Sequence, residues 1–386
     1  MEVKQIYSLV NQAVASMTGV NATLPTEDLS NLVDVGRSIF DANAYENFTK
    51  SLVDVIGKTI FVTRKYNGAS PKVYMDSWEF GSVMQKIRGE MPDAVENESW
   101  ELEDGASYDE NIFYRPQVSV KFFNSKTTFE IDQSITDLQV RSAFTSIQAL
   151  NSFLDMLFNE VEKKLTIAMD GLIMRVIDNF IGETLYAEYG GSAYSSKSTS
   201  KAVNILYLYK QVFTGSTLTA SDCLYDKDFL RFSTTLIKRY IARLQVATKI
   251  YNIGETTKFT PRDLLHVVLH ADYVAQVTSV LQSDTFHDEL VKLPLYEEVA
   301  YWQGTGSDFE WSSTSAVKIT TSGNHSINAD GIIGVMFDRD ALGVTNYNRR
   351  TPVKYNGKGE FTNYFHKQDA SFFNDFDEQF VVFFVA

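Results

Sequence analysis

Cysteine is nearly absent from this chain, with 1 Cys among 386 residues. A single cysteine excludes an internal disulfide and any metal site built from several thiolates. The residues around Cys223 also supply no recognisable partner that would activate it as a nucleophile. Disulfide-stapled folds are therefore excluded, and we expect Cys223 to be a buried, inert thiol.

Long apolar runs are missing as well. No stretch approaches the roughly 18 apolar residues that a membrane-spanning helix requires. The first residues, Met1 to Gln5, lack the basic segment followed by an apolar core that marks a secretory signal. We therefore expect a soluble protein that is made in the cytoplasm and has no membrane partner.

Positive charge is in deficit. The chain has 35 Lys and Arg against 49 Asp and Glu, which gives a formal net charge of −14. Because affinity for phosphates comes from clustered Lys and Arg, this balance argues against a nucleic-acid-binding surface. Arg349 and Arg350, beside Lys354 and Lys358, form a small basic spot, and we expect salt-bridge donors there rather than a DNA site.

The motifs of the common enzyme classes are absent too. The sequence contains no GxGxxG, P-loop, GxSxG or HExxH pattern. His266 and His270 have the spacing of helical zinc ligands, but Val267 to Leu269 between them reads as strand. On a strand the two histidines would lie about 13 Å apart, too far to share a metal. We expect no enzyme activity, no catalytic residue, no metal and no cofactor.

One long apolar stripe organises the chain. Between Ser142 and Leu185, apolar residues recur at three- and four-residue steps, which predicts a single helix. No proline interrupts it, Gly171 is its weak point, and Gly182 is the expected stop. From Phe153 to Ile181 alone the helix would be roughly 42 Å long. Such a rod suggests an extended molecule, although a long core helix in an ordinary enzyme is the alternative.

The segment before this helix is predicted to form projections that have no hydrophobic core of their own. Short amphipathic helices are expected up to Gly57, and residues 59–122 read as a long two-stranded excursion with an acidic tip. Isolated hairpins are marginal in water, so this excursion should rest on another surface. An acidic lid in a monomer is the alternative, and the carboxylates lack EF-hand spacing for calcium. The expected subunit-interface residues are apolar members of this segment: Trp78, Phe80, Met84, Ile87 and Trp100.

The second half of the chain mixes helices and strands. Tyr189 to Ser200 is a linker rich in Gly and Ser, and Asp226 should cap the helix that follows it. Buried strands are expected at 264–270 and 332–337, so residues 201–345 form an α/β or α+β unit. The chain returns to strands at its end, with a hairpin at 353–365 and a buried strand at 380–385.

This order of elements resembles the major capsid protein of tailed bacteriophages with the Hong Kong 97-type fold, in the branch of small short-tailed phages. The resemblance implies an α+β fold with a helical arm (1–58), an extended loop (59–125) and a peripheral domain with a spine helix (126–190). An axial domain (191–345) and return strands (346–386) complete it. The stretches that carry the likeness are Asn47–Gly57, Asp137–Gly182, Ile333–Leu342 and Tyr364–Phe384.

The resemblance also implies a function. The chain would assemble with itself into hexamers and pentamers of an icosahedral-type shell that encloses double-stranded DNA without sequence-specific binding. A separate scaffolding protein and a portal would be its assembly partners, and the virion capsid, assembled in the bacterial cytoplasm, its location. An encapsulin-like compartment is the alternative within this fold. A hydrolase with a capping insertion, or a tail or adhesion protein, is the alternative from another class.

Overall fold

The computed structural model describes most of the chain from Val118 onward and short stretches before it. Residues 42–57 of the predicted helical arm and much of the predicted excursion at 59–122 lie outside the described residues. The described residues are 3–15, 24–26, 30–41, 71, 73, 84–89, 103–105, 111, 113, 115, 118–190, 194, 197–284, 296–303 and 311–386.

Helices and strands alternate along the chain, which confirms the predicted α+β class. The chain forms two compact units, and the five-segment division expected from the sequence stays a prediction. The first unit comprises Met1–Phe80, Lys126–Arg175 and Val344–Ser371, and the second comprises Gly81–Ser125, Val176–Gly343 and Phe372–Ala386.

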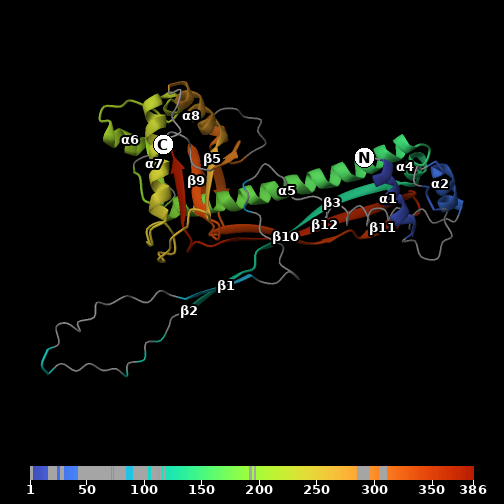
Figure 1. The fold of residues 1–386 in the computed structure, drawn as a ribbon, viewed down its shortest axis with the longest axis horizontal. Coiled ribbons are helices and arrows are strands. Elements are labelled where there is room, and N and C mark those ends of the chain that lie inside the picture. The colour runs from blue at the N-terminus through green and yellow to red at the C-terminus, as the bar shows by residue number, and fades with distance from the viewer. Residues whose placement is uncertain are drawn as a thin grey trace. The chain divides into compact units, whose positions relative to one another are not determined.

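The first unit is built on a four-stranded sheet around the long strand β12 (Figure 1). Strand β12 pairs along its length with β3, from Phe361 opposite Thr136 to Ser371 opposite Lys126. It also pairs with β11, so the hairpin predicted at 353–365 is confirmed. The elements here are α1 (Val3–Ala15), α2 (Leu32–Asp41), β3 (Lys126–Thr136), α4 (Asp137–Ala143), β10 (Leu342–Arg350), β11 (Val353–Asn356) and β12 (Phe361–Asn374).

The predicted long helix is present, but its ends differ from the expectation. Helix α5 (Ile147–Tyr189) has 43 residues, and the separate helix α4 precedes it. Gly182 does not end the helix; the end comes at Gly190, whose positive φ of 64° suits glycine and whose N–H donates to the Tyr186 carbonyl. Gly182 is a contact point instead, because a Cβ there would lie 2.6 Å from the Thr321 Cγ2 atom.

Two glycines of α5 should therefore respond in opposite ways to the same substitution. Gly171 is exposed, and a Cβ there would meet nothing within 4 Å, so Gly171→Ala should raise the free energy of unfolding by about 1 kcal/mol. Gly182→Ala is the matched control and should lower it, since Thr321 would have to move. Urea titration of the soluble subunit measures both. Equal shifts of the same sign would contradict this assignment.

The second unit is built around a five-stranded mixed sheet in the order β4-β13-β9-β5-β6. Its central strand β9 is buried along its whole length, so the strand predicted at 332–337 is confirmed, as are those at 264–270 and 380–385. The sheet strands are β4 (Ala202–Asn204), β5 (Leu265–His270), β6 (Glu297–Val299), β9 (Ile332–Asp338) and β13 (Phe380–Phe384).

Helices α7 and α8 lie beside β5 and β9 in this unit, and their apolar side chains share one core with the sheet (Figure 1). Asp226 caps α7 as predicted, because its side chain accepts from the Phe229 N–H. Asp272 lies in the first turn of α8, and its N–H donates to the His270 Nδ1 atom, so the histidine ring caps this helix. The helices are α6 (Ile205–Val212), η3 (Cys223–Tyr225), α7 (Lys227–Leu244), α8 (Ala271–Asp284) and α9 (Trp311–Thr314).

A small hairpin, β7 (Val317–Thr320) and β8 (Ser326–Ala329), is fastened to the C-terminal part of α5. Asn179 Oδ1 accepts from the Ser322 N–H at 2.7 Å, and Glu183 Oε1 accepts from the Gly323 N–H at 3.0 Å. Near the N-terminus, α2 begins at Leu32, and the Thr26 hydroxyl donates to the Oδ1 atom of Asn31, the residue before this helix. Within the described ranges, no helix combines the length and apolarity needed to cross a membrane.

Candidate subunit-interaction site

Two strands that are far apart in the sequence form a ribbon with two unlike faces. Strands β1 (Met84–Gly89) and β2 (Val118–Phe123) pair antiparallel, with Ile87 opposite Val120 and Lys86 opposite Lys121. Because side chains alternate between the faces of a strand, one face collects apolar residues and the other collects basic ones. We call the pair the ribbon; its apolar strip is Ile87, Val118, Val120 and Phe122, and its basic face is Lys86, Arg88 and Lys121.

The apolar strip is exposed. Its side chains have relative accessibilities of 65% for Ile87, 60% for Val118, 43% for Val120 and 65% for Phe122. Single exposed apolar residues are ordinary, but a contiguous group on one face marks an interaction surface or an aggregation hazard. Among the described residues, β1 and β2 pair only with each other, so within this part of the chain each also has an open edge. This strip is therefore the strongest candidate contact surface among the described residues.

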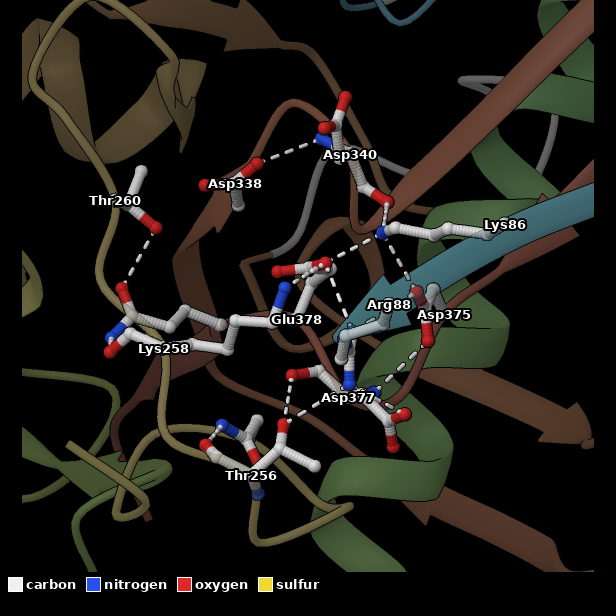
Figure 2. A network of polar contacts seen from close by, with 12 residues as sticks. Lys86, Arg88, Thr256, Lys258, Thr260, Asp338, Asp340, Asp375, Asp377 and Glu378 are labelled. Carbon is white, nitrogen blue, oxygen red and sulfur yellow. Dashed lines mark hydrogen bonds and ion pairs between the residues drawn. The ribbon is translucent and has the colours of Figure 1, made fainter. Parts of the chain in front are cut away.

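The basic face lies on a turn of three carboxylates, Asp375, Asp377 and Glu378, which we call the acidic turn. Lys86 Nζ donates to Asp375 Oδ2 at 2.8 Å and to Glu378 Oε1 at 2.5 Å. Arg88 Nη1 donates to Asp377 Oδ2 at 2.9 Å, and Arg88 Nη2 to Glu378 Oε1 at 3.2 Å. Lys121 Nζ donates to Asp375 Oδ1 at 3.1 Å. Figure 2 shows Lys86 and Arg88 reaching from β1 toward these carboxylates.

Lys258 and Thr256, on the segment before β5, complete the network from the other side. Lys258 Nζ lies 2.7 Å from Glu378 Oε1, and the Thr256 hydroxyl donates to the Asp377 carbonyl at 2.8 Å (Figure 2). The side chain of Asp375 is 0% exposed and that of Glu378 is 6% exposed. These two carboxylates are therefore largely removed from solvent, and ion pairs at buried groups are screened much less than ion pairs on the surface.

The paired groups shift one another's pKa values in the direction that favours their charged forms. Burial alone would raise the pKa of the Asp375 carboxyl, but the hydrogen bond and charge of Lys86 outweigh it and lower that pKa. The pKa of Glu378 is lowered in the same way, with Lys258 and Lys86 outweighing burial. Burial would lower the pKa of Lys86, yet Asp375 and Glu378 raise it. All of these groups are consequently charged near neutral pH.

The predicted interface residues are only partly within the described chain. Ile87 lies on the exposed apolar strip, but the side chain of Met84 and all of Trp78, Phe80 and Trp100 lie outside the described residues. Three strip residues, Val118, Val120 and Phe122 of β2, and the acidic turn were not predicted from the sequence. The alternation in Val118-Ser119-Val120-Lys121-Phe122 was a signal for the strip, whereas nothing local links Lys86 to Asp375.

The other singled-out residues have structural surroundings. Cys223 is buried, and burial raises the pKa of its thiol to about 12, as expected of an inert cysteine. Arg349 pairs with Glu162 at 2.7 Å and Arg350 pairs with Asp369, which confirms both as salt-bridge donors. His266 and His270 lie on strand β5 as predicted. In the described part of the chain, no group of three or more His, Cys, Asp or Glu could hold a metal ion.

Comparison with known proteins points to phage capsids. The family model described as Phi29-like phage major capsid protein matches residues 10–384. No curated protein matches the chain. Solved structures that resemble it include "Capsid structure of Staphylococcus phage Andhra", with 12% identity, a TM-score of 0.49, and coverage of 84% of this chain and 86% of that one. Another is "Capsid structure of the Cyanophage P-SCSP1u", with 9% identity, a TM-score of 0.43, and coverage of 84% and 90%.

Proposed function

The chain belongs to the Phi29-like phage major capsid protein family and is a structural protein of the capsid shell, and we propose that the apolar strip of the ribbon is a contact between copies. The single observation that carries this proposal is the exposure of Ile87, Val118, Val120 and Phe122 on one face of a two-stranded ribbon. A shell is made of many copies of one chain, so every copy has other copies of the same chain as its neighbours.

The energetics favour such a contact. Burying a Val, Ile or Phe side chain that was exposed contributes about 1.5–3 kcal/mol. A shell repeats each contact many times, so even a contact that is weak between two copies becomes decisive in the assembly. The opposite face of the ribbon is occupied by the acidic turn, which leaves the apolar strip as the face that can receive a partner. Trp78, Phe80, Met84 and Trp100 belong to the same proposed interface as predictions.

We further propose the arrangement that the sequence resemblance implies: a Hong Kong 97-type fold whose copies form hexamers and pentamers of a closed shell. The shell would enclose double-stranded DNA, with a scaffolding protein and a portal as partners, and would assemble in the host cytoplasm. The net charge of −14 supports a shell that encloses DNA without binding it tightly, because the negative charges of the chain and of the DNA phosphates repel each other. The chain would act structurally, without enzyme activity of its own.

Replacing Val118 by aspartate should weaken assembly, because a charge would have to be buried where an apolar side chain was. We expect at least about a tenfold rise in the subunit concentration needed for particles. Light scattering and negative-stain microscopy measure this, with the scaffolding protein present where assembly needs it. Val246→Asp is the matched control, since Val246 is 63% exposed and Val118 is 60% exposed.

Circular dichroism and hydrogen exchange of β9 should show that both variants fold as the unchanged chain does. If Val118→Asp assembles at the same concentration as the unchanged chain, the apolar strip is not a contact between copies. An equal loss in Val246→Asp would mean that added negative charge, rather than the strip, is responsible, and would count against the proposal in the same way.

A further inference from the structure

We propose that the acidic turn and the basic face form an electrostatic latch that fixes the ribbon on its own subunit and thereby presents the apolar strip before a partner copy binds. The latch consists of Lys86, Arg88, Lys121, Asp375, Asp377 and Glu378. The consequence for assembly rests on the proposed role of the strip, whereas the latch itself does not.

The acidic turn stabilises the pairing of the two ribbon strands. Lys86 and Lys121 lie directly opposite each other in the register. Like charges at opposed positions destabilise a strand pair, and a two-stranded ribbon is marginal in water even without that repulsion. Asp375 accepts a hydrogen bond from Lys86 on its Oδ2 atom and one from Lys121 on its Oδ1 atom. The carboxylate therefore turns a repulsive cross-strand pair into a bridge.

The acidic turn is held independently of the ribbon. The Asp375 N–H donates to the Ala341 carbonyl at 2.6 Å, and the Glu378 N–H donates to the Asp375 carbonyl at 3.1 Å. The Gly254 N–H donates to the Phe376 carbonyl at 2.9 Å, and Lys258 keeps its pair with Glu378. Lifting the ribbon would break none of these contacts. The ribbon can thus open as a local unit while the sheet of the second unit stays folded.

Charge balance favours the closed latch in the free subunit. If the ribbon lifted, Lys258 would be the one cation of the described chain still paired with the three carboxylates of the acidic turn. Asp375, whose side chain is 0% exposed, would lose both ammonium groups that pair with it. Removing the partners of a buried charge costs far more than breaking a surface ion pair. The ribbon should therefore be closed most of the time, with its apolar strip facing outward.

A closed latch prepares the strip for docking. A surface that is already fixed in its bound orientation loses less conformational entropy when a partner arrives. Weakening the latch should accordingly slow assembly even though the latch residues face the chain's own acidic turn. The latch is then a positioning device for the apolar strip.

Hydrogen exchange of the soluble full-length subunit tests the latch directly. Asp375→Asn removes the charge that bridges Lys86 and Lys121, and we expect at least about tenfold faster exchange of amides in 84–89 and 118–123. Exchange in β9 should not change. Asp340→Asn is the matched control, because Asp340 is exposed and only its backbone carbonyl accepts from Lys86. The control should exchange as the unchanged chain does.

A ribbon-side variant, Arg88→Met, keeps the test decisive if Asp375→Asn fails to fold. It removes a cation that pairs with Asp377 and Glu378, and Arg88 lies opposite Ser119 rather than another cation. Unchanged ribbon exchange in a folded latch variant would overturn the latch, whatever Val118→Asp does. Faster ribbon exchange with undiminished assembly would uphold the latch as a local contact and reject its role in presenting the apolar strip for docking.

Discussion

Replacing Phe180 by alanine should remove about 3–5 kcal/mol from the free energy of unfolding of the second unit. Phe180 is fully buried, and its ring stacks on Phe380 at 4.1 Å between centroids. Phe380 in turn stacks on Phe337 at 5.6 Å, and Phe337 stacks on His266 at 5.4 Å. The rings form a column that joins α5 to β13, β9 and β5, so the loss of Phe180 opens a cavity at its end.

Urea titration of the soluble subunit, followed by circular dichroism, measures this loss. Phe259→Ala is the control, because Phe259 is 53% exposed and should change the stability by no more than about 0.5 kcal/mol. If Phe180→Ala stays within the same 0.5 kcal/mol, the ring column contributes nothing and the sheet is held to α5 by other contacts.

The long helix was predictable because its signal is local. The apolar stripe predicts that Leu165 and Leu172 are buried, and the structure confirms both, at 4% and 5% exposed. The end of the helix was not predictable, since glycine marks a helix end in one context and a close approach in another. Only the packing of Thr321 against Gly182 distinguishes the two, and Thr321 is distant in the sequence.

Among the strands, too, those with a local signal were predictable and those that depend on distant residues were not. Continuous apolar runs such as Ile332 to Phe337 identify buried strands without any knowledge of their neighbours. Strand β1 (Met84–Gly89) was missed because Lys86 and Arg88 break its apolar pattern. Their presence makes sense only beside Asp375 to Glu378, almost at the other end of the chain. Of the apolar strip, only Ile87 was therefore predicted from the sequence, and the latch was not predicted at all.

The last prediction concerns acid and the first unit. His366 on β12 is 6% exposed, and its Nδ1 atom pairs with the Thr351 hydroxyl at 3.3 Å. Its buried Nε2 atom has no hydrogen-bond partner among the residues that the structure describes. Burial lowers the pKa of His366 to about 4, and the nearby charge of Arg349, itself paired with Glu162, lowers it further in the same direction. The folded chain therefore keeps this ring neutral at pH values where the unfolded chain already binds a proton.

Stability from this histidine is present above a pH of about 6.5 and is lost as the pH falls toward 4. We expect a loss of about 2 kcal/mol between pH 7 and pH 5, and about 3 kcal/mol by pH 4. Asp369 does not account for a loss of stability between pH 7 and pH 5. The hydrogen bond from Arg350 lowers the pKa of its carboxyl, so the stability that Asp369 contributes is lost only at more acidic pH. Protection factors of amides in β3 and β12 measure the opening free energy of the first unit at each pH. His366→Gln cannot bind the proton, so its curve should be flatter over the same range, and curves that fall in parallel would show that another group governs the acid response.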